Sequence, residues 1–99
     1  MSDWNQTLSE HRRLTILRTL DRAPAFSCND SILVTMCNQV SLRATRDQIV
    51  GDLAWLVEQQ LATAETLDGG LIVATATRRG CEVAQGIVVH PGVQRPSAR

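Results

Sequence analysis

The feature that most constrains this fold is a helical pattern that runs directly into a β-hairpin. Residues 45–48 read Thr-Arg-Asp-Gln, a capping box in which the Thr45 hydroxyl and the Gln48 side chain satisfy backbone groups at a helix start. The helical spacing then ends, and residues 61–67 and 71–76 are rich in Thr, Val, Ile and Leu. The Asp-Gly-Gly between them supplies the positive φ angles of a tight turn. The sequence therefore predicts a helix followed at once by a two-stranded hairpin.

Cap signals predict three more helices. A capping box at residues 7–10 is expected to start the first helix, which Ala-Pro at residues 23–24 should end. After a short extended piece, Asn29 or Asp30 is expected to cap the next helix. Thr77 is expected to cap a fourth helix that ends at a glycine.

Apolar spacing predicts which faces of these helices are buried. Arg12 and Arg18 are expected to face water, and a helical wheel places Asp52 and Trp55 away from the core face of their helix. The apolar residues expected to face the core are Leu14, Ile16, Leu17, Leu20, Ile32, Leu33, Met36, Cys37, Val40, Ile49, Val50, Leu53, Leu56 and Val57.

The order of these elements is that of a winged helix, the helix-turn-helix variant with a β-hairpin after its third helix. We therefore expect an α+β fold, mainly α, with a three-helix core, a two-stranded wing and a fourth helix. A chain of 99 residues should form one domain. We expect that domain over residues 1–86 and an extended C-terminal tail, broken by two prolines, over residues 87–99.

Two stretches resemble known winged-helix regulators. Residues 53–61, Leu-Ala-Trp-Leu-Val-Glu-Gln-Gln-Leu, and residues 77–80, Thr-Arg-Arg-Gly, resemble the "L-x-x-L-x-x-x-G-L" and "T-x-x-G" patterns of the ArsR and MarR kind. Over almost the whole chain the sequence is similar to short winged-helix proteins of Mu-like prophages, often given an ArsR-type label. That similarity is carried by residues 16–18, Asn29, residues 45–48, residues 52–56 and residues 91–96. The resemblance implies a transcription regulator. The glycine that the family places before its hairpin is Gln60 here.

The first functional hypothesis is that the chain binds double-stranded DNA as a phage or prophage transcriptional regulator. The third helix would enter the major groove, and the candidate contacts are Arg43, Thr45, Arg46 and Gln48. Charge opposes this hypothesis. The chain carries ten basic and ten acidic residues, and positions 43–75 hold two basic against five acidic ones. Phosphate contacts supply much of the affinity for DNA.

The alternative hypothesis is a protein-interaction or phage-assembly module that uses the same fold without DNA, with a second copy or a phage protein as partner. Its candidate contacts are Trp55, Gln59, Val88 and Val89. An aromatic residue exposed on a helix is a favoured interface anchor. Trp55 could instead be covered by the C-terminal tail, and the apolar residues 87–89 could dock on the domain or on a second copy.

Basic residues elsewhere offer weaker possibilities. The first helix carries Arg12, Arg13, Arg18 and Arg22, which form either a phosphate-facing patch or an ordinary solvated face. Arg95 and Arg99 in the tail could reach a minor groove or an acidic partner as a flexible arm.

No enzyme, cofactor or metal site is expected. Cys28, Cys37 and Cys81 form no C-x-C or C-x-x-C pair, and His11 and His90 are remote from each other. Phosphate-binding, zinc-protease and hydrolase motifs are missing from the sequence. No apolar run is long enough to cross a membrane and no signal peptide precedes the first helix. We therefore expect a cytoplasmic protein with reduced thiols.

Overall fold

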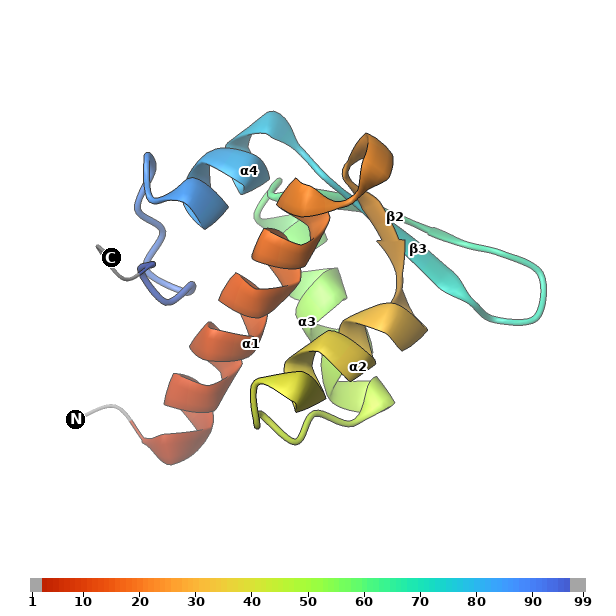
Figure 1. The fold of residues 1–99 in the computed structure, drawn as a ribbon, viewed down its shortest axis with the longest axis horizontal. Helices are drawn as coiled ribbons and strands as arrows, with labels where there is room; N and C mark the ends of the chain where they lie inside the picture. Colours follow the sequence, from red (N-terminus) through yellow and green to blue (C-terminus); the bar gives the residue numbers. More distant parts are fainter. Residues whose placement is uncertain (1–2, 97–99) are drawn as a thin grey trace.

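The computed structural model describes residues 3–96, which form four helices and a three-stranded antiparallel sheet (Figure 1). The elements, in chain order, are α1 (Trp4–Arg22), the 3-10 turn η1 (Pro24–Phe26), β1 (Ser27–Asn29), α2 (Asp30–Gln39), α3 (Arg46–Glu58), β2 (Ala62–Thr66), β3 (Ile72–Ala76) and α4 (Arg78–Gln85). The architecture is α+β and mainly helical. None of these helices is long and apolar enough to cross a membrane.

The sheet contains one strand more than the predicted hairpin. β2 and β3 form the hairpin, and the extended piece before α2 becomes β1, which pairs with the other side of β3. The Ser27 and Thr75 hydroxyl oxygens lie 2.6 Å apart across this pairing. The chain reaches β1 through Ala25 and Phe26, both of which have positive φ angles. The order β1-β3-β2 fixes the root of the hairpin to the helical core.

Most of the predicted helix ends are confirmed. Asn29 caps α2, Thr45 and Gln48 form both bonds of the capping box of α3, and Thr77 caps α4. α4 ends at a left-handed Gly86, as predicted. The predicted start of α1 is wrong. Its N-cap is Asp3, whose carboxylate accepts a 2.7 Å hydrogen bond from the Gln6 amide, so the helix begins one turn earlier.

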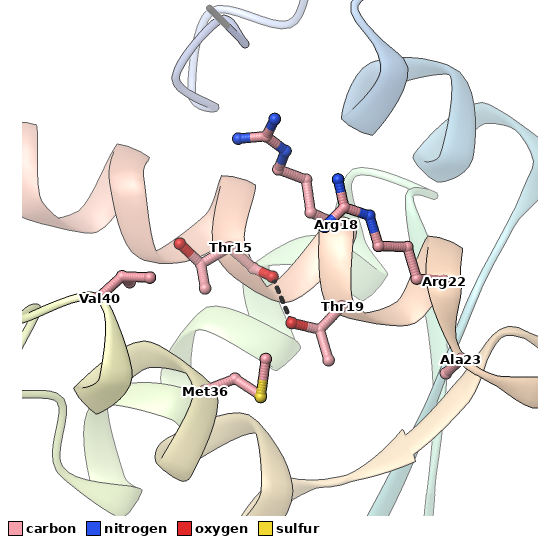
Figure 2. A pocket seen from close by; sticks show the side chains of 7 residues that line it. All are labelled: Thr15, Arg18, Thr19, Arg22, Ala23, Met36 and Val40. Atoms are coloured by element: carbon pink, nitrogen blue, oxygen red, sulfur yellow. Dashed lines mark hydrogen bonds between the residues drawn. The ribbon is translucent and has the colours of Figure 1, made fainter.

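α2 buries a much narrower face than its sequence predicts. Leu33 and Cys37 are fully buried, but the predicted core residues Ile32, Met36 and Val40 are 46%, 36% and 57% exposed. Met36 and Val40 point toward a pocket beside α1 (Figure 2). The prediction is wrong because the outer side of this helix is not covered by another element of residues 3–96. Val57 on α3, also predicted as core, is exposed too.

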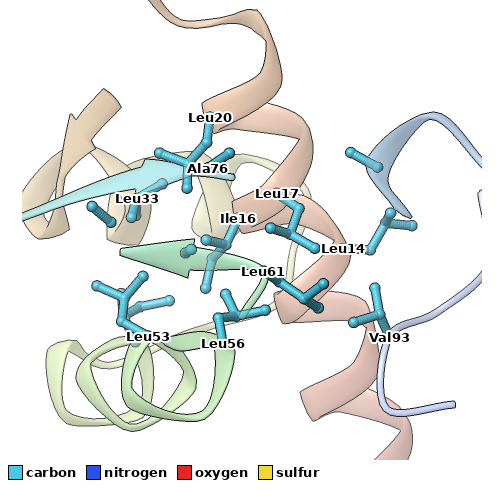
Figure 3. Close-up of a cluster of buried hydrophobic side chains, with 14 of the residues drawn as sticks. Leu14, Ile16, Leu17, Leu20, Leu33, Leu53, Leu56, Leu61, Ala76 and Val93 are labelled. Carbon is cyan, nitrogen blue, oxygen red and sulfur yellow. The ribbon is translucent and has the colours of Figure 1, made fainter. Parts of the chain in front are cut away.

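The core lies between α1, α3 and the sheet, and leucine dominates it (Figure 3). The buried apolar residues are Leu14, Ile16, Leu17, Leu20, Leu33, Cys37, Ala44, Ile49, Leu53, Leu56, Leu61, Ala62, Ala74, Ala76, Val83, Ala84 and Val93. Val93 belongs to the tail, so the tail segment packs against the same core as the helices.

Arg12 and Asp52 are buried against each other, contrary to the prediction that both face away from the core. Arg12 Nε lies 2.7 Å from Asp52 Oδ2, and the side chains are 9% and 5% exposed. Arg13 Nε lies 3.4 Å from the other carboxylate oxygen of Asp52. Two arginines of α1 thus share one carboxylate of α3, which joins the two helices across forty positions of sequence.

Gly80 gives a structural reason for the Thr-x-x-Gly pattern. The Thr77 hydroxyl accepts a hydrogen bond from the Gly80 amide at 3.1 Å and donates one to the Gln60 carbonyl at 2.8 Å. A Cβ at position 80 would overlap the backbone carbonyl of Leu61. The start of α4 therefore lies directly on the end of α3, where Gln60 takes the left-handed conformation with φ +63°.

Candidate functional site

Polar groups in the first turn of α3 are largely engaged in the hydrogen bonds of its own capping box. The Thr45 hydroxyl accepts a hydrogen bond from the Gln48 amide at 3.2 Å, and the Gln48 side-chain oxygen accepts one from the Thr45 amide at 3.0 Å. Both side chains are exposed but are held at the helix start. The side-chain nitrogen of Gln48 is then the main polar group that this pair can offer to a ligand.

Arg46 forms hydrogen bonds and an ion pair within the molecule. Its Nε and Nη2 lie 3.0 and 2.8 Å from Oδ2 of the fully buried Asp30, and Nη2 also donates to the Gly70 carbonyl at 2.7 Å. This guanidinium therefore links the starts of α2 and α3 to the tip of the hairpin. Arg46 can hold the start of α3 and the hairpin in place beside each other. Its pairing with Asp30, however, reduces the positive charge that it can offer to a phosphate.

Arg43 stands in the turn before α3 with a φ of +48° and an exposed side chain. It is the one basic residue between positions 40 and 77 that forms no ion pair with a described carboxylate. Arg43 is thus the best-placed cation of this surface for contact with a phosphate.

Acidic groups still dominate the exposed part of α3 and the hairpin. Asp52 leaves this surface because it is buried with two arginines, and Glu58 lies at the far end of α3 from its first turn. Asp47, Glu65 and Asp68 remain exposed. The candidate DNA-binding residues are therefore brought together at one end of α3, but among at least as many carboxylates as free cations.

Trp55 lies beneath the C-terminal tail. The Arg13 guanidinium stacks 4.0 Å from the centre of its ring, and the His90 ring meets its edge at a centroid distance of 5.2 Å. Arg13 also donates to the Gly92 carbonyl at 3.0 Å. Of the two alternatives for Trp55, cover by the tail is the one that the structure adopts.

Both ring nitrogens of His90 make hydrogen-bond contacts that hold the tail. Gln59 Oε1 lies 3.1 Å from His90 Nε2, and the Gly92 amide donates to His90 Nδ1 at 3.1 Å. Neutral imidazole with its proton on Nε2 satisfies both contacts. Burial lowers the pKa of His90, and the charges of Arg79 and Arg13 lower it further.

The other two candidate partner-binding residues have different environments. Val88 is half-buried and packs against the core, whereas Val89 is 61% exposed. Trp55 and Gln59 are therefore engaged inside the molecule, and Val89 is the candidate that remains open. Arg95 is exposed, and Arg99 lies outside the described residues.

A groove between α1 and α2 is the recess that sequence analysis missed. Its volume is about 420 Å³, and Figure 2 shows α1 and α2 side chains around it. We call it the α1–α2 groove and define it by Thr15, Arg18, Thr19, Arg22, Met36 and Val40. The signal for it was present in the sequence as the spacing of Ile32, Met36 and Val40, one helical turn apart.

The cysteines do not form a reactive or metal-binding cluster. All three are free thiols, and within residues 3–96 no three His, Cys, Asp or Glu side chains are grouped to hold a metal ion. Burial, together with the charge of nearby Asp52 and against the opposing charge of Arg12, raises the pKa of the Cys37 thiol to about 11. Burial also raises the pKa values of Cys28 and Cys81. These thiols are protonated at neutral pH.

Comparison with known proteins gives one phage relative and one bacterial relative. It is 42% identical over 95 residues to the uncharacterized protein gp26 of Escherichia phage Mu, covering 96% of this chain and 97% of gp26. It is 33% identical over 76 residues to an uncharacterized protein of Haemophilus influenzae, covering 77% of this chain and 74% of that protein. No family model and no solved structure matches. The chain therefore belongs to the family of phage Mu protein gp26.

Proposed function

We propose that this chain is a non-enzymatic winged-helix protein of a Mu-like phage or prophage whose main role is to bind another protein. The order of elements, the antiparallel pairing of β1 with β3 and the hairpin directly after α3 support the winged-helix assignment. Such a fold does not itself specify DNA binding, because function depends on the surface that the fold carries.

The observation that carries the proposal is the exposed face of α2. Its one charged residue, Asp30, is fully buried, so the outward side presents no charge. Ile32, Met36 and Val40 form an apolar stripe along it. Interface cores are poor in charged residues and rich in large apolar ones such as methionine. This face meets that description better than α3 does.

Site-specific crosslinking tests the proposal in cells that make the protein. A photo-reactive amino acid at position 36 should give one discrete protein adduct, identified by mass spectrometry. The same amino acid at Arg78, whose side chain is 94% exposed on α4, is the matched control and should give none. Val40→Glu should abolish the adduct at position 36 without unfolding the domain. Equal labelling at both positions would contradict the proposal.

DNA binding through α3 is the second candidate function. It is favoured by the joint exposure of Arg43 and Gln48 beside a hairpin that Arg46 holds in place. If Arg43 supplied the main phosphate contact, log affinity would fall with log salt by a slope of only about −0.9 per phosphate.

The DNA candidate is tested by binding to mixed-sequence and phage-genome duplexes at low salt. Arg43→Ala is the variant of choice, because Arg46→Ala would also leave the buried Asp30 without its partner. Binding that weakens at least tenfold in Arg43→Ala and falls with salt would support this candidate. An absence of binding at low salt would eliminate it.

A further inference from the structure

Two exposed surfaces of this molecule have complementary chemistry, and the charged side chains of both lack an ion-pair partner within residues 3–96. One is the α1–α2 groove, and the other is the tip of the hairpin. The groove is apolar with a basic rim, whereas the tip is apolar with an acidic centre. This further inference rests on the proposed protein-binding role and names its partner.

The floor of the groove is effectively apolar. The Thr19 hydroxyl donates to the Thr15 carbonyl at 2.8 Å, and the Thr15 hydroxyl donates to the His11 carbonyl at 3.0 Å. Because both hydroxyl protons are used inside α1, the threonines offer mainly their methyl groups to a ligand. Met36 of α2 and Val40, the C-cap residue of that helix, complete the floor (Figure 2).

The rim of the groove is positive. Arg18 and Arg22 lie on its α1 side, and neither forms an ion pair with a carboxylate of residues 3–96. The nearest acidic residue in sequence, Asp21, is hydrogen-bonded to Gln85 of α4 at 3.0 Å. An occupant that carries a carboxylate between exposed apolar side chains would match both the apolar floor and this basic rim.

The hairpin tip has that composition. Leu67 and Leu71 are 40% and 37% exposed on either side of the turn. The Leu67 amide donates to the Leu71 carbonyl at 2.7 Å, and the Gly70 amide donates to the Leu67 carbonyl at 3.0 Å, so backbone hydrogen bonds close the tip. Asp68 is exposed within it and forms no ion pair with a described residue.

The tip does not occupy the groove of its own molecule. Arg46 binds the Gly70 carbonyl and holds the tip beside the start of α3. Figure 1 shows the hairpin projecting past α2 and α3, away from α1. Nor can two grooves pack face to face, because their unpaired arginines would meet arginines of the same sign. The charge pattern instead favours hairpin against groove.

We propose that the protein associates with a second copy of itself by seating the Leu67–Leu71 tip of one copy in the α1–α2 groove of the other. Asp68 then lies beside the arginine rim. The contact joins different surfaces of the two copies, so it either closes reciprocally into a dimer or continues head to tail. A formal net charge of zero removes the long-range repulsion that would oppose such contact.

Sedimentation velocity of the purified full chain over a range of concentrations and salt tests this contact. The wild type should self-associate, and salt should weaken the association. Asp68→Arg and Arg22→Glu should each weaken it at least tenfold, because each places like charges together. Glu58→Arg makes the same charge change outside both surfaces and should leave the association unchanged.

Combining Asp68→Arg with Arg22→Glu in one chain should restore self-association, because each reversed charge meets the other across the contact. Circular dichroism of every variant checks that it is folded. A monomeric wild type, equal behaviour of Asp68→Arg and Glu58→Arg, or no recovery in the double variant would each overturn the inference. A monomeric wild type that still gives an adduct with another protein at position 36 would overturn self-association and leave the proposed function intact.

Discussion

The buried ion pair between α1 and α3 allows a quantitative prediction. Asp52→Ala would leave the Arg12 guanidinium buried without the carboxylate that now lies 2.7 Å from it. Removing one partner of a buried pair costs about 3–5 kcal/mol, whereas a domain of this kind is stable by about 5–15 kcal/mol in total. At about 4–8 °C per kcal/mol for this size, the Tm should fall by at least about 12 °C.

Urea unfolding followed by circular dichroism measures this effect. Glu58→Ala removes an exposed carboxylate from the same helix and should change the free energy of unfolding by less than about 0.5 kcal/mol. The double variant Arg12→Met/Asp52→Leu replaces the pair with apolar groups and should recover part of the loss, because Arg13 loses the carboxylate but keeps its contacts with Trp55 and Gly92.

A loss of less than about 1 kcal/mol in Asp52→Ala would mean that Arg12 reaches water and would refute the prediction of an uncompensated buried charge. A double variant as unstable as Asp52→Ala would refute it as well. In that case the packing of α1 on α3 would depend on the shapes and hydrogen bonds of the Arg12 and Asp52 side chains. The instability of Asp52→Ala would then not come from an uncompensated charge.

Three further predictions concern the last part of the chain. Gly80→Ala should destabilise the domain by about 2 kcal/mol or more, because its Cβ would overlap the Leu61 carbonyl; an unchanged urea midpoint would contradict this packing. Gly92→Ala should push the tail off Trp55, which would otherwise meet the new Cβ, and so change the tryptophan fluorescence while α-helical circular dichroism is retained; an unchanged emission spectrum would show that the tail tolerates a side chain there. The lowered pKa of His90 means that the unfolded chain binds its proton more readily, so tail docking should be intact above about pH 6.5 and lost as the pH falls further. His90→Gln should remove that pH dependence of the fluorescence, and its persistence would assign the transition to another group.

Local signals in the sequence were enough to predict most of the elements. Caps at Asn29, Thr45 and Thr77 and the glycines of the hairpin act through backbone groups within a few residues, so they can be recognised without tertiary information. The start of α1 was missed because Asp3 and Thr7 are both competent caps. Sequence pattern alone does not choose between two caps one turn apart.

Burial was harder to predict than secondary structure. Neighbouring residues on a helix are about 100° apart, so the buried Leu33–Cys37 line of α2 and its exposed Ile32–Met36–Val40 line merge into one apolar pattern. The pairing of Arg12 with Asp52 joins positions forty residues apart and depends on how α1 crosses α3. Spacing therefore marks both apolar lines of α2 without saying which one is left exposed, and it does not predict the buried ion pair.

The candidate DNA contacts illustrate the same limit. The sequence correctly groups Arg43, Thr45, Arg46 and Gln48 at one helix start, because they are neighbours in the chain. It could not predict that Arg46 would be paired with a buried carboxylate from another helix. That pairing reduces the positive charge that this helix start can offer to a phosphate.

The central claim is that the exposed face of α2, with the α1–α2 groove beside it, is where this protein binds its partner. The start of α3 is not. The most direct measurement is the ¹³C-methyl NMR signal of Met36, which is simple to assign because the chain has two methionines. The account predicts that this signal shifts and broadens as protein concentration rises, and that low-salt duplex DNA leaves it unchanged. A Met36 signal that stays constant with concentration, in a protein that binds the duplex tightly, would contradict the account.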